Sequence, residues 1–195
     1  MKSIKTNYTF WIIVSCVSIF LVNLDALIVN IMEARNFITA REMIQDGHWI
    51  LTTLNGEPRY QKPPLPTWLT AFSAMMFGLK SLTALRIPAA LTTLLMVIYF
   101  NKLAVLFTEN KKYAFISSLI VATSFYVVFA GRNGQWDIFT HGFMMVCIYY
   151  LYLFFTSENK KYQRAIIAAI FLGLSFMSKG PVSFYVLLLP FLISF

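Results

Sequence analysis

The sequence is poor in charge, in cysteine and in the short motifs of soluble enzymes. Only 12% of its 195 residues are charged, against about 25% in an average soluble domain. The two cysteines, Cys16 and Cys147, lie in apolar runs, so a disulfide framework is excluded and both are predicted to be core residues. The sequence contains no glycine-rich nucleotide loop, zinc-ligand spacing or nucleophile elbow. Nucleotide chemistry of the soluble kind therefore has no support.

The chain is rich in hydrophobic residues. They make up 58% of it, and phenylalanine alone occurs 19 times. This composition excludes a disordered chain and almost any soluble globular domain, which leaves a polytopic membrane protein. The net charge of +8 would suggest nucleic acid as a partner of a soluble protein. In a membrane protein we attribute it to basic residues that collect in cytoplasmic loops, so no nucleic-acid partner is predicted.

Several apolar runs approach the roughly 20 residues that a membrane-spanning helix needs. They predict an all-α fold, a polytopic transmembrane helix bundle, with spans at residues 8–29, 87–107, 113–130, 138–155, 165–178 and 182–195. The first run has no cleavage site after it and is interpreted as an uncleaved anchor. The last is still apolar at Phe195. We therefore expect residues 1–195 to be the N-terminal part of one larger transmembrane domain.

The apolar run at residues 66–78 is too short to cross and favours an interfacial or re-entrant segment. If it does not cross, the densest basic segments share one side, which the positive-inside rule assigns to the cytoplasm together with the N-terminus. Segments 30–86, 131–137 and 179–180 then lie outside. A crossing at 66–78 would reverse every later loop. The cytoplasmic basic residues are Lys2, Lys5, Lys102, Lys111, Lys112, Lys160, Lys161 and Arg164.

The long outer loop, residues 30–86, opens with an amphipathic helical pattern that Gly47 is expected to end. We expect juxtamembrane amphipathic helices in this loop. Glu33 is unusual because it falls beside the apolar side, near the membrane plane, where a carboxylate must face protein or a water-filled cavity. Two interpretations stay open: a functional acid, or an ordinary acid favoured by the helix N-terminus.

The same loop continues with a turn signal at Asn55-Gly56 and a proline-rich stretch at residues 63–66. A stretch stiffened in this way can hold Arg59, Tyr60 and Lys62 against a phosphate group, since phosphate attracts lysine as a point charge and arginine as a fork. The alternative is that Lys62 only contacts anionic lipid head groups.

The two shorter outer segments also carry charge. Arg132 and Asp137 flank Trp136 in a loop that is either a functional rim or an interfacial anchor with an ion pair. Lys179 stands at a span end, where snorkelling is the simpler interpretation. His141 follows Asp137 by one helical turn and is expected to be structural rather than a metal ligand.

These residues occur in an order that resembles the glycosyltransferase C superfamily, in particular the bacterial family 39-type enzymes related to protein O-mannosyltransferases and lipid A aminoarabinose transferases. That family shows an Asp-Glu-x-Arg-Tyr start, an Asn-Gly turn, a Phe-Glu-Lys-Pro-Pro stretch, an Arg…Asp loop and a Thr-Lys-Gly-Pro loop. The counterparts here are Glu33 with Arg35, Asn55-Gly56, Lys62-Pro63-Pro64, Arg132 with Asp137, and Lys179-Gly180-Pro181.

The resemblance implies a multi-pass glycosyltransferase of the bacterial inner membrane with its catalytic cavity at the outer face. The donor would be a polyprenyl-phosphate-linked sugar and the acceptor lipid A, a protein or another cell-envelope glycan. No cofactor is expected. The implied catalytic residues are Glu33 and Asp137, and the implied substrate- or phosphate-binding residues are Arg35, Arg59, Tyr60, Lys62, Arg132 and Lys179.

Two positions depart from the family pattern. Met32 replaces the leading Asp, which leaves Glu33 or Asp137 as the base, or Asp25 if the helix is shifted. Gln61 replaces a Glu that could help to hold a metal ion, so no metal is predicted. Two other hypotheses stay open. One is a transporter or flippase for lipid-linked anionic sugars that uses the same cations without chemistry, and the other is an inactive binding scaffold, which the Met32 substitution permits.

Overall fold

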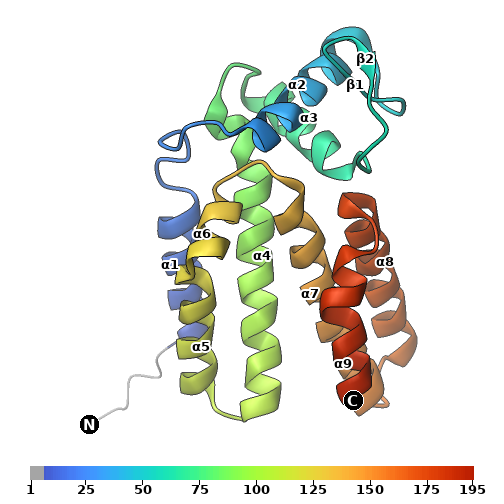
Figure 1. Ribbon diagram of the computed structural model, residues 1–195. Helices are drawn as coiled ribbons and strands as arrows, with labels where there is room; N and C mark the ends of the chain where they lie inside the picture. Colours follow the sequence, from blue (N-terminus) through green and yellow to red (C-terminus); the bar gives the residue numbers. More distant parts are fainter. Residues whose placement is uncertain (1–6) are drawn as a thin grey trace.

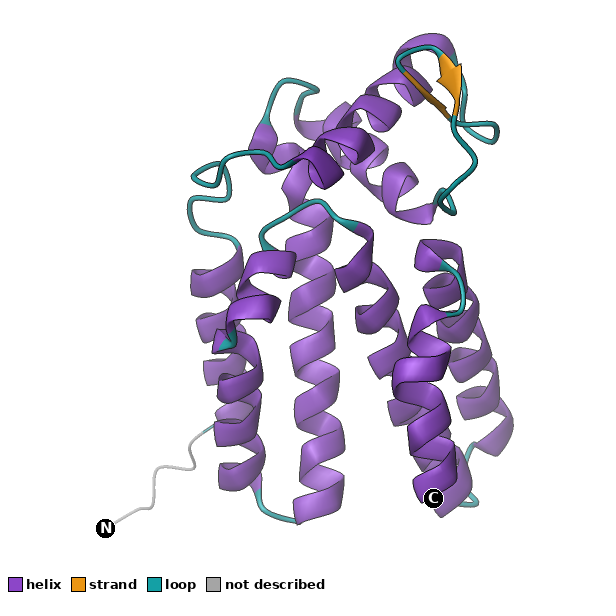
Figure 2. Cartoon of the chain, in the orientation of Figure 1, coloured by secondary structure: helices purple, strands orange, loops and turns teal. Residues whose placement is uncertain are grey.

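The computed structural model describes residues 7–195 as a bundle of helices with a small helical layer across one end (Figure 1). Lys2 and Lys5, which contribute to the expected orientation, lie outside the described residues. Figure 2 shows that the strands are confined to a short hairpin in the end layer. The elements are α1 (Tyr8–Phe20), α2 (Ile31–Asp46), β1 (Thr53–Leu54), β2 (Glu57–Pro58), α3 (Leu65–Phe77), α4 (Leu82–Thr108), α5 (Lys111–Thr123), α6 (Phe125–Gly131), α7 (Trp136–Thr156), α8 (Lys161–Lys179), a π-helical segment (Phe184–Leu188) and α9 (Leu189–Ser194).

The expected all-α membrane bundle with juxtamembrane helices is confirmed. By length and composition, α4 and α7 can each cross a membrane. Residues 113–130, expected as one span, form two helices, α5 and α6, that meet at a 64° bend. The bend lies at Ser124, whose extended backbone (ψ 139°) interrupts the helical path between them.

The end layer consists of α2, α3 and the hairpin. Asn30 caps α2 by accepting hydrogen bonds from the backbone N–H groups of Met32 and Glu33. Gly47 ends the helix in the left-handed conformation (φ 78°), as expected. The predicted turn at Asn55-Gly56 is also confirmed: both residues have positive φ, the combination that closes a two-residue hairpin.

Helix α2 is buried on two sides, which its amphipathic pattern did not indicate. Its expected polar side includes Thr39 and Glu42, yet both are buried. The hairpin covers them: the Thr53 hydroxyl and the Asn55 N–H donate to the Glu42 carboxylate over 2.5 and 2.7 Å. Hydrogen bonding makes this burial tolerable and fixes the hairpin to α2.

The layer is joined to the bundle by polar side chains. The Asn36 amide donates to the Thr70 hydroxyl of α3 (3.1 Å) and to the Gly134 carbonyl between α6 and α7 (2.7 Å), and it accepts from the Thr67 hydroxyl (2.8 Å). Asn36 is completely buried, so these bonds are costly to lose. They position the long loop over the N-terminal end of α7.

The bundle core is apolar and includes both cysteines, which are free and buried as predicted. Helix α1 ends at Phe20, and Asp25 lies beyond it as an exposed residue of the following turns. The three segments expected to share one side, residues 30–86, 131–137 and 179–180, lie at the same end of the bundle (Figure 1).

Candidate functional site

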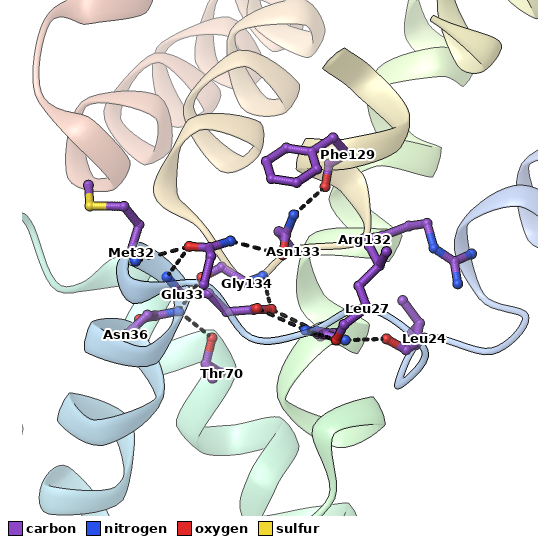
Figure 3. Close-up of polar contacts among 12 residues, drawn as sticks. Leu24, Leu27, Met32, Glu33, Asn36, Thr70, Phe129, Arg132, Asn133 and Gly134 are labelled. Carbon is purple, nitrogen blue, oxygen red and sulfur yellow. Dashed lines mark hydrogen bonds and ion pairs between the residues drawn. The ribbon is translucent and has the colours of Figure 1, made fainter. Parts of the chain in front are cut away.

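Glu33 lies at the centre of a buried hydrogen-bond network. Its carboxylate forms a two-pronged ion pair with Arg86 of α4, with Nε–Oε1 and Nη2–Oε2 distances of 2.7 and 2.8 Å. The Gly134 N–H donates to the same Oε1 over 2.9 Å. Arg86 also donates to the carbonyls of Leu24 and Leu27 (Figure 3). Both charged side chains are fully buried, so each depends on the other for neutralisation. The pair therefore joins α2 to α4.

Gly134 is required at its position by close packing. A Cβ there would approach the Phe37 ring, with Cζ only 2.9 Å away. Its backbone carbonyl and N–H are bound by Asn36 and Glu33. The loop between α6 and α7 therefore packs closely against α2. Trp136 and Asp137 follow Gly134 directly, so this contact positions them next to the end layer.

This geometry argues against a catalytic role for Glu33. An acid that acts as a general base needs an oxygen within hydrogen-bonding reach of an acceptor hydroxyl. Both oxygens of Glu33 are occupied by Arg86 and Gly134, and the side chain has no exposed surface. In this geometry Glu33 has a structural role as the partner of Arg86, and its predicted role as the base stays a prediction.

Arg132 is directed away from this network in Figure 3. Its guanidinium donates to the carbonyls of Ile19 (2.5 Å) and Asn23, at the end of α1. Ile19 lies in the last turn of α1, where a cation interacts favourably with the exposed carbonyl end of the helix. The phosphate-binding role expected for Arg132 gains no support, because its donors stabilise the C-terminal end of α1.

Asp137 and Lys179 do meet, as the sequence placed them at one end of the bundle. The Lys179 ammonium forms an ion pair with the Asp137 carboxylate, and each side chain keeps 25% of its surface exposed. His141, one turn along α7, makes a 2.8 Å hydrogen bond to Ser183 through Nδ1. We call Asp137, Lys179, His141 and Ser183 the Asp137 group. Unlike Glu33, Asp137 retains access to solvent.

Arg59 and Arg35 bring two cations together beside this group. Arg59 is largely buried and donates to the Arg35 carbonyl and the Thr39 hydroxyl, both over 3.2 Å. Burial, and secondly the charge of Arg35, lower the pKa of Arg59. Within residues 7–195 neither arginine has an ion-paired carboxylate. Both line a cavity of about 340 Å³, together with Gln61 and the exposed acid Glu57. Two arginines against one glutamate leave the lining with a net positive charge, which favours an anion.

Trp136 connects the arginines to the Asp137 group. The Arg59 guanidinium lies 5.0 Å from the centre of the Trp136 ring, a cation–π contact. The indole is 3% exposed, yet its N–H has no hydrogen-bond partner among the described residues. Trp136, Arg59 and Lys62 line a cavity of about 10 Å³, which is room for about one water molecule or one ligand oxygen. A buried donor without a partner indicates an acceptor from outside the chain.

The remaining predicted residue, Tyr60, is 65% exposed and contacts none of these groups through a hydrogen bond. Sequence reasoning missed Arg86 and Asn36 as network members and Trp136 as a donor. Arg86 had one usable signal, a basic residue five positions into an apolar helix. Within residues 7–195, no group of three His, Cys, Asp or Glu side chains could hold a metal ion.

Comparisons with known proteins bear on the whole chain. A family model described as dolichyl-phosphate-mannose-protein mannosyltransferase matches residues 61–195. An uncharacterized protein of Aquifex aeolicus (strain VF5) is 30% identical over 147 residues, 75% of this chain and 29% of that protein. An undecaprenyl phosphate-alpha-4-amino-4-deoxy-L-arabinose arabinosyl transferase of Serratia proteamaculans (strain 568) is 25% identical over 183 residues, 92% of this chain and 33% of that protein.

Solved structures show the same fold. The crystal structure of ArnT from Cupriavidus metallidurans bound to undecaprenyl phosphate matches 93% of this chain and 34% of its own, with a TM-score of 0.80 and 20% identity. The apo structure of the same protein gives a TM-score of 0.78 and 21% identity, over 92% and 34% of the two chains. The chain thus spans about a third of the length of the relatives it matches.

Proposed function

Because the chain belongs to the dolichyl-phosphate-mannose-protein mannosyltransferase family, we propose that the whole protein transfers a sugar from a polyprenyl-phosphate donor to an acceptor at the outer face of a bacterial inner membrane. The observation that carries the proposal is the pair Arg59 and Arg35, two cations without an ion-paired carboxylate in the described residues, beside a partly exposed carboxylate at the same end of the bundle.

The donor phosphate is the anion that this pair suits. As the sugar leaves, the polyprenyl phosphate takes up the electron pair of the broken bond between its oxygen and the sugar C1. Cations placed beforehand at that oxygen stabilise the developing charge. Arg35 and Arg59 supply two such cations at the larger cavity. Arg59 also lines the small cavity, where Lys62 supplies a third cation and the Trp136 indole N–H a neutral donor. No nucleotide is needed, because the lipid phosphate is itself the leaving group.

Asp137 is the acid we assign as the base. The acceptor oxygen forms the new bond to C1, and its proton passes to the Asp137 carboxylate. Lys179, ion-paired to Asp137, orients that carboxylate. Lys179 is thereby given a positioning role in place of phosphate binding. His141 lies one helical turn after Asp137 on α7. Its hydrogen bond to Ser183 joins α7 to the segment that follows α8.

The names of the relatives suggest two donor classes. The family description names dolichyl-phosphate-mannose, and the Serratia protein's name gives undecaprenyl phosphate-linked aminoarabinose. Both donors present the same chemistry, a sugar joined through C1 to a lipid phosphate. We propose an undecaprenyl-phosphate donor with an amino-pentose, since several curated relatives carry that name, with lipid A as the acceptor.

The test is sugar transfer by the full-length protein in membranes, with undecaprenyl-phosphate-linked aminoarabinose and dolichyl-phosphate-mannose supplied separately. Transfer with one of them, lost in Arg59→Gln and Lys62→Gln but kept in Lys80→Gln, is the expected result. Lys80 is an exposed cation at the same end and serves as the matched control. Transfer that survives in both Arg59→Gln and Lys62→Gln would refute the phosphate site.

One observation favours a second function, an inactive scaffold that binds the lipid-linked anion. Met32 stands where the family pattern has an Asp, its side chain is 40% exposed, and the Arg35 guanidinium contacts its sulfur at 3.8 Å. The site then lacks the acid that the family pattern has at this position. Retention of the labelled donor without product, abolished by Arg59→Gln, would identify this function. Restored transfer in Met32→Asp would show that the lost acid is the cause.

A further inference from the structure

A second cationic cavity lies at the opposite end of the bundle. It has a volume of about 560 Å³ and is lined by the start of α1, the last turns of α4, the start of α5 and Tyr149 of α7. Figure 1 shows these helix ends together, away from α2 and α3. Along α4, Lys102 is sixteen residues beyond Arg86, which is about 24 Å. This cavity is therefore separate from the proposed transfer site.

Two lysines give this cavity its charge. Lys102 and Lys111 line it, and none of the described residues that line it is acidic. Within residues 7–195 neither lysine takes part in an ion pair. Glu109, on the turn between α4 and α5, is exposed and does not line the cavity. The cavity is thus an unneutralised positive pocket in a region otherwise built from apolar helices.

Aromatic rings hold one of these cations in place. The Lys102 ammonium lies 4.2 Å from the centre of the Tyr99 ring and 5.7 Å from that of Tyr149. The two rings pack edge to face with their centres 5.3 Å apart. A lysine held over aromatic faces loses less freedom when it binds an anion than a lysine that extends freely into water. Lys102 is thereby preorganised.

The surface around the cavity is suited to lipid. Phe10 and Trp11 of α1 are 53% and 50% exposed, and Tyr113 of α5 is 64% exposed. Large aromatic residues at the end of a transmembrane bundle mark the level of the lipid head groups. Beyond them, α1 exposes further apolar side chains at Val14 and Val17 along its length. A molecule with a charged head and an apolar tail would meet both surfaces.

We propose that this cavity binds the head group of an anionic phospholipid, with the phosphate between Lys102 and Lys111 and the acyl chains along α1. The volume of 560 Å³ is far larger than an inorganic ion requires and suits a phosphate with its attached glycerol. Tyr8 and Tyr149 line the same space and supply hydroxyl groups for the glycerol part. The proposal depends on the cavity and the membrane bundle and is independent of the transfer reaction.

The experiment uses the full-length protein in nanodiscs that contain phosphatidylcholine with phosphatidylglycerol. Lipid retained after transfer to detergent is counted by native mass spectrometry. We expect phosphatidylglycerol to be retained in preference to phosphatidylcholine. A basic residue near an anionic surface contributes about fivefold to binding, so Lys102→Gln and Lys111→Gln should each weaken retention about fivefold. The double variant should lose the preference. Lys102→Arg, which keeps the charge, should retain it.

Lys112→Gln is the matched control, since Lys112 is the next residue along, is exposed, and does not line the cavity. It should retain phosphatidylglycerol as the wild type does. Equal retention by the wild type and the double variant would overturn the proposal. A rise in melting temperature with inorganic phosphate alone, equal to the rise with phosphatidylglycerol, would also overturn it by assigning the cavity to a free anion. Because lipid is counted directly, failure here leaves the transferase proposal unaffected.

Discussion

Two carboxylate–cation pairs lie at the same end of the bundle and differ in nearly every physical respect. Glu33 and Arg86 are completely buried, and the fork of the guanidinium meets both carboxylate oxygens. Asp137 and Lys179 each keep 25% of their side-chain surface exposed. The first carboxylate has a further donor in the Gly134 N–H. The second carboxylate keeps exposed surface beside its lysine.

The difference shows that charge type alone does not identify a catalytic acid in a membrane bundle. A charge at the membrane plane has to be neutralised or functional, and the Glu33–Arg86 pair satisfies the first condition entirely. Its role is to join the α2 layer, the α6–α7 loop and α4. The joint holds the α6–α7 loop at Gly134, and Trp136 at the end of that loop lies against the Arg59 guanidinium. The buried pair thus supports the exposed one.

The buried pair should show the largest effect when it is broken. Glu33→Gln leaves Arg86 buried without its counter-charge, and we expect the free energy of unfolding to fall by about 3–5 kcal/mol. The measurement is equilibrium unfolding of the full-length protein in bicelles. Glu57→Gln, at an exposed hairpin residue, is the control. The joint replacement Glu33→Leu with Arg86→Met should recover most of the loss. Equal stability of Glu33→Gln and the control would show that the pair is not structural.

The second largest effect is expected at Gly134, where the α6–α7 loop packs against Phe37 of α2. Gly134→Ala places a methyl group against the Phe37 ring, and we expect a loss of about 1–3 kcal/mol in the free energy of unfolding. Gly173→Ala is the matched control, because nothing lies within 4 Å of its added carbon inside α8. That variant should gain up to about 1 kcal/mol from helix propensity. If Phe37→Leu does not relieve the Gly134→Ala loss, the steric explanation is wrong.

The indole N–H should affect donor binding rather than stability. Trp136→Phe keeps a ring under Arg59 and removes the unpartnered donor, so folding should be unaffected. A hydrogen bond to a charged group contributes about 1.5–3 kcal/mol, and we expect the KM for the lipid-linked donor to rise about 10- to 150-fold with kcat little changed. Steady-state kinetics with the full-length protein give both values. An unchanged KM would mean that the N–H meets no ligand oxygen.

The smallest effect is expected at the other end of the bundle. Glu158 and Lys161 form an exposed pair three residues apart, 2.6 Å between Nζ and Oε1. Exposed pairs contribute less than about 1 kcal/mol, so Lys161→Gln should leave the unfolding curve nearly unchanged. The same unfolding assay measures it, once at low and once at high salt. A loss comparable to that of Glu33→Gln would invalidate the use of burial to rank these pairs.

Much of the fold follows from the sequence because apolar runs, the Asn30 cap, Gly47 and Asn55-Gly56 are local signals. The candidate site can be predicted from the sequence only in part. Composition and order bring Arg59, Lys62, Asp137 and Lys179 to one end of the bundle, but the partner of Glu33 is 53 residues away in the chain. Nothing local distinguishes an acid that faces an arginine from one that faces a cavity.

The central claim is that Asp137, and not Glu33, carries the chemistry. The most direct test is the rate of sugar transfer per folded molecule for full-length Asp137→Asn and Glu33→Gln, with folded protein quantified in the same membranes. We predict that Asp137→Asn folds normally and loses about 10²–10⁴ in kcat, whereas Glu33→Gln reduces the folded amount and leaves the rate of the folded molecules near that of the wild type. A fully folded but inactive Glu33→Gln, beside an active Asp137→Asn, would contradict the account.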